Sequence, residues 1–464
     1  MGKIALAAIV SLWVIPTTIM VNRIVPEPYM DEIFHIPQAQ QYCKGNFGSW
    51  DPMITTPPGL YYLSLAHVTS LFPGFYYLEA ASSFFDMCST AILRSVNGVL
   101  AVVCSVILYD IVTHLKPTLN DRKVMLHAVV LSLYPLHWFF TFLYYTDVAS
   151  VTAVLAMYLA SLKKNYWFSA LIGAFAVVIR QTNIIWVLFV ACTGIINISA
   201  THGKHDTKTA ASYVSIKHGW AYATGSTSTE GVNLRKRKIV KSGDTIEQSS
   251  SSHASYPSFS SGAKEAHAVT PHFAQMLYFS LVSVLAQAPM HFTITQAVDL
   301  FQMLFRKSRP LLFFQMSLAL VVGILSVHFF SVAHPYLLAD NRHYPFYLWR
   351  KVIMAHWSIK YLLVPVYTCS WLSIIHMLGK IKSKIWVLAY FLATAAVLVP
   401  APLIEFRYYT IPFYFLVLHC NNRDDHSWIL TGTLYIGVNI FTMVVFLFRP
   451  FHWDHEPGIQ RFIW

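Results

Sequence analysis

The chain has 464 residues, of which 56% are hydrophobic and only 12% are charged. Soluble domains carry about 25% charged residues, so this composition excludes an ordinary soluble protein and indicates an all-α polytopic membrane protein. The net charge is +12. The basic residues cluster in alternate loops between apolar segments, as is typical of loops that stay cytoplasmic. The charge therefore does not call for nucleic acid as a partner.

Long apolar segments predict the membrane spans. The first, residues 4–24, is longer than the apolar part of a signal peptide and no cleavage site follows it, so we expect a retained span. Further spans are expected at residues 88–112, 124–142, 146–162, 166–180, 183–199, 273–291, 311–333, 355–378, 385–402, 407–420 and 427–448. With a crossing or re-entrant segment at 292–305, about 12–14 membrane segments result.

Two regions between the spans differ from simple loops. Residues 25–87 have mixed polarity, and we expect short interfacial helices around Phe34–Tyr42 and Gly59–Leu71. Residues 200–272 are rich in Ser, Thr and Lys and cannot bury enough apolar surface to fold. We therefore predict an N-terminal membrane module at 1–199, a disordered cytoplasmic insert at 200–272 and a C-terminal membrane module at 273–464.

An acidic pair follows the first span. Asp31, Glu32 and His35 are spaced so that a short helix places them on neighbouring faces. Carboxylates at the edge of a span can act as a general base, or they can form a polar rim that caps a helix. The residues alone leave both interpretations open.

Other polar residues are predicted on the same side of the membrane as Asp31. Asp51 lies in a rigid proline-rich loop that either positions it over a cavity or serves as a hinge, and Arg180 lies in a polar break between two spans. Arginine and histidine in such positions can bind phosphate. The remaining members of this set are Asp340, Asn341, Arg342, His343, Tyr344, Glu405 and Arg407.

Nucleotide-binding motifs are absent from the sequence, which contains neither a P-loop nor a Gly-rich dinucleotide fingerprint. No stretch is long and polar enough to form a soluble nucleotide-binding domain. If the chain is a transferase, its donor must therefore arrive from the membrane. A sugar carried by a lipid phosphate fits this requirement. Scattered charges among the spans also leave a transporter or channel as the alternative.

The polar motifs, taken together, resemble one family. In chain order they are Met30–Gln40, Asp51–Tyr61, Arg180–Trp186, Leu338–Tyr344 and Glu405–Tyr408. This combination is similar to the eukaryotic dolichyl-phosphate-glucose-dependent α-1,2-glucosyltransferases, which add the last glucose to the lipid-linked oligosaccharide used in N-glycosylation. The resemblance runs to the final Gln460–Trp464 and lapses in the insert at 200–272.

The resemblance implies a GT-C fold in the endoplasmic reticulum membrane with a luminal active site. It implies dolichyl phosphate β-glucose as donor, a diglucosylated oligosaccharide on dolichyl diphosphate as acceptor, and inversion at the anomeric carbon without a metal or other cofactor. Asp31 would be the base with Glu32 as its neighbour, and Arg342, His343 and Arg407 would bind the donor phosphate. Residues expected to contact substrate are His35, Gln38, Asp51, Arg180, Asp340, Asn341, Tyr344 and Glu405.

Overall fold

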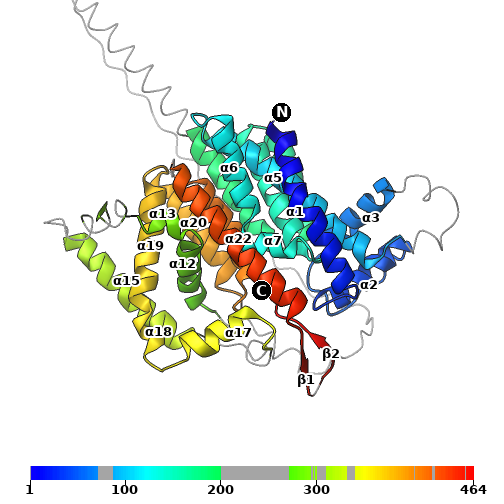
Figure 1. Cartoon of the computed structure of the whole chain (residues 1–464). Coiled ribbons are helices and arrows are strands. Elements are labelled where there is room, and N and C mark those ends of the chain that lie inside the picture. Colours follow the sequence, from blue (N-terminus) through cyan, green and yellow to red (C-terminus); the bar gives the residue numbers. More distant parts are fainter. Residues whose placement is uncertain are drawn as a thin grey trace, which may run out of the picture. The chain divides into compact units, whose positions relative to one another are not determined.

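The computed structural model describes residues 2–71, 87–199, 271–293, 296, 298–299, 302, 310–331, 340–401, 403–420, 424–454 and 456–464. These residues are mostly helical (Figure 1). Within the described ranges, the strands are β1 (Phe451–Trp453) and β2 (Glu456–Gln460), which form a small antiparallel hairpin. The expected all-α class is confirmed.

The long helices match the predicted spans. Among the described residues, those long and apolar enough to cross a membrane are α1 (Gly2–Ile24), α5 (Thr90–Leu115), the stretch Ile359–Gly379 and α22 (Asp425–Phe448). Shorter apolar helices are α8 (Thr146–Leu162), α9 (Tyr166–Ile179), Asn183–Ser199, α12 (Ala274–Ala286), α15 (Pro310–Phe329) and α20 (Lys384–Leu398). The chain is therefore a polytopic membrane protein, as its composition predicts.

Some predicted spans are interrupted rather than continuous. The expected span at 124–142 is divided into α6 (Asp121–Ser132) and α7 (Pro135–Phe140). The division falls at Tyr134, which leaves helical geometry because the proline after it disfavours a helical conformation at the preceding residue. Further element boundaries separate α12 from α13 (Ala288–His291), α18 (Ile359–Leu362) from α19 (Val364–Gly379), and the 3₁₀ turn η2 (Phe406–Tyr409) from α21 (Thr410–Leu418).

The short helices expected between the first spans are present. They are α2 (Glu32–Cys43) and α3 (Gly59–Leu71). Gly59 lets α3 approach α9, because a Cβ at this position would lie 2.6 Å from the carbonyl oxygen of Val178. A disulfide between Cys43 and Cys88, which the sequence did not predict, joins the end of α2 to the residues just before α5.

The described helices belong to one compact unit, made of residues Met1–Ile196 and Thr270–Trp464. Within it, α5 packs against α1, α6 and α8. The predicted insert at 200–272 lies, apart from Pro271 and His272, outside the described residues, as do most of the predicted re-entrant segment at 292–305 and the basic residues Arg306–Arg309. The division of the chain at 199 and 272 stays a prediction.

Candidate active site

The backbone just before α2 sets the position of the acidic pair. Met30 has a left-handed φ of 56°, which turns the chain sharply before Asp31. The backbone N–H of Asp31 then donates to the hydroxyl of Tyr145, 3.2 Å away. Neighbouring carboxylates are thereby directed into different surroundings.

Glu32 is wholly buried in an ion pair. Its carboxylate accepts from Nε and Nη2 of Arg94, at 2.9 and 2.6 Å, and from the backbone N–H groups of Tyr29 and Tyr144, at 3.0 and 2.5 Å. Arg94 also donates to the carbonyl of Val25 at 2.6 Å. Glu32 thus fastens the segment after α1 to α5 and to the segment before α8. Its side chain is not exposed, whereas a catalytic base needs a carboxylate oxygen that can contact the substrate.

Asp31, in contrast, is 44% exposed and pairs with Arg407, whose Nη1 lies 3.0 Å from its carboxylate. Arg407 comes from η2 and also donates to Glu405, at 3.0 Å from Nε and 2.7 Å from Nη2. Its guanidinium packs over the rings of Phe140 and Tyr145, 5.4 and 5.3 Å from the centroids. The structure therefore brings Asp31, Glu405 and Arg407 together, although Arg407 is far from Asp31 in sequence.

Asp147 joins this charged cluster from the first turn of α8. Its Oδ1 accepts from Nη1 of Arg180 at 2.7 Å, and its Oδ2 lies 3.8 Å from Arg407. Arg180 also packs over the ring of Tyr408, at 5.6 Å. Sequence reasoning missed Asp147, because an acid in the first turn of an apolar helix is ordinary helix chemistry. The sequence feature that could have indicated Asp147 is a charged residue at the start of a strongly apolar segment.

Asn97 fixes the loop that leads into α8 and thereby positions Asp147. Its side-chain amide donates to the carbonyl oxygens of Leu143 and Tyr145, at 2.7 and 2.9 Å. Since Asn97 is buried on α5, just one turn after Arg94, the same helix positions both Glu32 and the entrance of α8. A rigid helix therefore supports both halves of the charged cluster.

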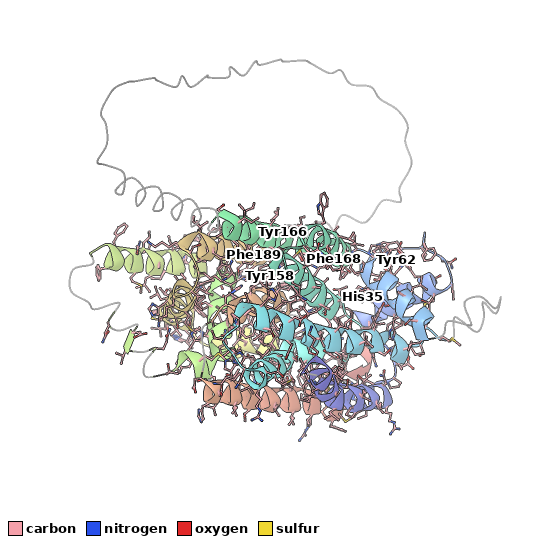
Figure 2. All side chains as sticks on the ribbon, turned by 90° about the horizontal axis from the view of Figure 1, so that it is seen from above. His35, Tyr62, Tyr158, Tyr166, Phe168 and Phe189 are labelled. Carbon is pink, nitrogen blue, oxygen red and sulfur yellow. A yellow bond between two sulfur atoms is a disulfide. The ribbon has the colours of Figure 1, made fainter. Side chains whose placement is uncertain are left out.

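His35 lies one helical turn from Asp31 and contacts Tyr61 of α3, with 2.6 Å between Nδ1 and the hydroxyl. Burial lowers the pKa of His35; the nearby Asp31 carboxylate opposes this effect and the Arg407 guanidinium adds to it. The imidazole is therefore neutral near pH 7. Figure 2 shows His35 on the side of the molecule where α2 and α3 lie.

Gln38 and Asp51 shape the loop between α2 and α3. The Gln38 amide donates to the carbonyl of Ser49 at 2.7 Å and accepts from the N–H of Asp51 at 2.9 Å. The Asp51 carboxylate in turn accepts from the N–H of Met53 at 2.9 Å. These residues hold the proline-rich loop against α2.

The polar group at 340–344 packs on the C-terminal hairpin. The guanidinium of Arg342 donates to Asp340 at 2.8 Å and to Gln460 at 2.8 Å, and lies 4.6 Å from the ring centroid of Trp453. Burial by itself would raise the pKa of Asp340, but the hydrogen bonds and charge of Arg342 outweigh it, so this pKa lies below its usual range. The side chain of Asn341 accepts from Nε1 of Trp453 at 2.9 Å.

The last residues of the chain join this polar group to the charged cluster. Tyr29, near the start of α2, exchanges hydrogen bonds of 2.6 and 2.7 Å with the backbone of Arg461. Trp464 packs against both Tyr344 and Phe406, at ring distances of 4.9 and 6.1 Å. His343 lies 3.2 Å from the backbone oxygen of Trp464. In Figure 1 the hairpin and α17 (Tyr344–Leu348) accordingly lie close to the end of α22.

The structure also contains an apolar cavity of about 320 Å³. It runs between α12 and α22, and Phe406, the residue before Arg407, forms part of its wall together with Trp464. The other lining residues are Tyr134, Pro135, Leu136, Val282, Leu285, Ala286, Leu434, Tyr435 and Val438.

Comparison with known proteins identifies the family of the chain. The model of the DIE2/ALG10 family matches residues 25–418. The chain belongs to the DIE2/ALG10 family. The matched region contains Asp31, Asp147, Arg180 and Arg407, whereas the C-terminal hairpin lies beyond it.

Curated members of the DIE2/ALG10 family align along nearly the whole chain. A protein of Arabidopsis thaliana is 54% identical over all of this chain and all of its own length. A protein of Homo sapiens is 33% identical over 96% of this chain and 94% of its own, and one of Drosophila melanogaster is 29% identical over 98% and 97%. Each is named Dol-P-Glc:Glc(2)Man(9)GlcNAc(2)-PP-Dol alpha-1,2-glucosyltransferase. No solved structure matches the chain.

Proposed function

We propose that this protein transfers glucose from dolichyl phosphate glucose to a Glc2Man9GlcNAc2 oligosaccharide on dolichyl diphosphate, with an α-1,2 linkage. Its family and the printed names of its relatives support this reaction and do not favour the transporter alternative. The observation that carries the mechanism is the half-exposed Asp31 carboxylate, paired with Arg407.

Asp31 is the proposed general base. The 2-hydroxyl of the acceptor glucose gives its proton to the Asp31 carboxylate while the hydroxyl oxygen attacks the anomeric carbon of the donor. The bond between that carbon and the phosphate oxygen breaks, and the electron pair leaves with dolichyl phosphate. A single displacement converts the β donor into an α product.

Arg407 is the proposed partner of the departing phosphate. It already orients Asp31, and its guanidinium can stabilise the negative charge that develops on the leaving group. Asp147 and Arg180 hold it in place from α8 and from the end of α9. Arg342 and His343 fit a supporting role, because Arg342 is engaged by Asp340 and Gln460.

The remaining predicted contacts divide in the same way. Gln38, Asp340 and Glu405 hold neighbouring groups in place and act on substrate only through them. His35, Asp51, Asn341 and Tyr344 stay proposed substrate contacts. The isoprenoid chain of the donor occupies the apolar cavity lined by Phe406, since this chain needs apolar surroundings and Phe406 directly precedes Arg407 in the chain.

We place the protein in the endoplasmic reticulum membrane with Asp31 on the luminal side. The disulfide between Cys43 and Cys88 supports this orientation, because disulfides persist in oxidising compartments such as this lumen. The basic loops at the opposite helix ends agree with it as well.

Glucose transfer by the purified full-length protein tests the proposal. The reaction contains dolichyl phosphate glucose and a diglucosylated lipid-linked acceptor, and a product one hexose heavier with an α-1,2 linkage is expected. A matched reaction with EDTA is expected to run at the same rate. Absence of transfer, under conditions in which a related luminal glucosyltransferase works, would reject the proposed activity. Restoration of a lost rate by a divalent ion would reject metal independence alone.

A further inference from the structure

A second cavity, of about 260 Å³ and more polar than the first, lies where the end of α5, the turn between α19 and α20, and the end of α21 meet. Its lining residues are Leu115, Lys116, Pro117, Thr118, Leu119, Ile381, Lys382, Leu418 and His419. We call it the dilysine cavity, after Lys116 and Lys382. None of its residues belongs to the charged cluster around Asp31.

The dilysine cavity is remote from that cluster. Arg94, which holds Glu32, is the fifth residue of α5, and Lys116 follows the last residue of this helix. A 26-residue helix is about 39 Å long. The helix α21, which has 9 residues, also separates the two sites: it starts at Thr410, shortly after Arg407, and ends just before His419. At this end of the helices the hydroxyl of Tyr158 lies 2.9 Å from Nε2 of His419.

Each lysine of the cavity packs on a tryptophan. The ammonium group of Lys116 lies 5.6 Å from the ring centroid of Trp428, and that of Lys382 lies 5.3 Å from that of Trp386. Both lysines are half-buried and their charges act on the ring of His419. Two positively charged side chains therefore line one small cavity, and each also contacts a tryptophan ring.

Neither ammonium group has a carboxylate partner within the part of the chain that the structure describes. Burial lowers the pKa of Lys116 to about 8, and a bound anion would favour its charged form. Other lysines at these helix ends are paired: Lys3 and Lys163 with Asp110, and Lys123 with Asp425. Lys116 and Lys382 therefore differ from these neighbouring lysines, because no carboxylate among the described residues offsets their positive charge.

We propose that the dilysine cavity binds a phosphate group. The phosphate belongs either to the headgroup of an anionic glycerophospholipid at the membrane surface or to free inorganic phosphate. Lysine ammonium groups bind phosphate oxygens through charge-assisted hydrogen bonds, and the half-buried setting weakens the competition from water. This inference does not depend on the proposed glucose transfer.

Binding is measured on the full-length protein in detergent with two probes. One is inorganic phosphate, followed by equilibrium dialysis. The other is phosphatidic acid in phosphatidylcholine nanodiscs, followed by native mass spectrometry against phosphatidylcholine alone. The test variant is Lys116→Gln with Lys382→Gln. The matched control is Lys163→Gln with Lys164→Gln. It removes the same amount of charge just after α8, from lysines that do not line the cavity.

Wild type and control are expected to bind, and the test variant to bind roughly tenfold or more weakly, since it loses the charge-assisted hydrogen bonds of both lysines. Binding of phosphatidic acid alone identifies the lipid headgroup, and saturable binding of inorganic phosphate identifies the free ion. Binding by none of the proteins, or equal binding by all, overturns the proposal.

A footprint on the wild type keeps the test decisive if the test variant does not fold. Acetylation of lysines is followed by mass spectrometry with and without each probe. Bound phosphate is expected to protect Lys116 and Lys382 and to leave Lys163 and Lys164 unchanged. Equal acetylation of all four lysines with and without both probes would refute phosphate binding in the cavity.

Discussion

Asp31 and Glu32 are adjacent residues of the same chemical type, yet their surroundings give them different roles. Glu32 is buried against Arg94, whereas Asp31 is half-exposed and turned toward Arg407. A buried carboxylate that accepts hydrogen bonds on both oxygens has no free position for a substrate proton. The pair therefore combines a proposed base with the residue that holds its backbone in place.

The first prediction concerns Asp31→Asn. An amide of the same shape cannot accept the proton, so turnover should fall by about 10²- to 10⁴-fold, while the melting temperature in detergent stays close to that of the wild type. The rate is measured as glucose transfer from dolichyl phosphate glucose. A variant with wild-type turnover would show that another group is the base.

Glu32→Gln is the matched comparison. It leaves Arg94 buried without its counter-charge, which costs about 3–5 kcal/mol of folding free energy. We expect a clearly lower melting temperature than that of Asp31→Asn. The reverse pattern, a stable Glu32→Gln protein without activity, would assign the base to Glu32.

His35 gives a prediction for pH. Its folded-state pKa lies below 6.5 because it is buried, so below pH 6.5 the unfolded chain binds the proton that the folded chain does not. The stability of the wild type should therefore fall as the pH drops below 6.5, by up to about 1.4 kcal/mol per pH unit from this residue.

His35→Asn removes this contribution. Melting temperatures at pH 7.5 and pH 5.5 should differ less in the variant than in the wild type, and the other histidines serve as a common background. An unchanged difference would mean that His35 does not titrate differently in the folded and unfolded chains.

The sequence revealed the chemistry of the site residues but not all their partners. The motif around Asp31 and the arginine at 407 were found from the sequence, but their contact spans 376 positions, and spacing carries no information over that distance. Asp147 was missed because only the fold shows that Arg180 and Arg407 meet there.

At the level of elements, apolar length predicted α1, α5 and α22 well, because a bilayer span needs about 20 apolar residues. The same criterion did not resolve the break at Tyr134, where a proline divides one apolar segment. Apolar length also could not predict the disulfide between Cys43 and Cys88, since the pairing depends on where α2 and α5 lie.

The disulfide should stabilise the site side of the protein. Replacement of Cys43 and Cys88 by Ser together removes a cross-link over a separation of 45 residues, which we expect to cost about 2–4 kcal/mol. The melting temperature of the double variant should be lower and insensitive to dithiothreitol. The wild-type temperature should fall on reduction.

Cys104→Ser with Cys420→Ser is a control for the loss of two cysteines, because both thiols are buried and free. This variant should keep the response to dithiothreitol. If the wild type shows no such response, and thiol labelling finds Cys43 and Cys88 free, the cross-link is absent from the native protein.

At the scale of the whole molecule, the two ends of the helices differ in charge chemistry. One end carries the cluster of Asp31, Asp147 and Arg407 and the disulfide. The other carries lysines, including Lys116 and Lys163, beyond the last residues of α5 and α8. Positive residues concentrate on the cytoplasmic side of membrane proteins, so this asymmetry predicts the orientation.

N-glycosylation of inserted acceptor sites measures that orientation. Gly48→Thr creates an acceptor at Asn46 in the loop before Asp51, and Gly48 has open space around its Cβ position. Arg235→Thr creates one at Asn233, in the expected cytoplasmic insert. Because the oligosaccharide is added only in the lumen, the Gly48→Thr protein should carry a glycan sensitive to endoglycosidase H and the Arg235→Thr protein none. A glycan on Asn233 but not on Asn46 would invert the proposed orientation and place Asp31 in the cytoplasm, where the proposed acceptor could not reach it.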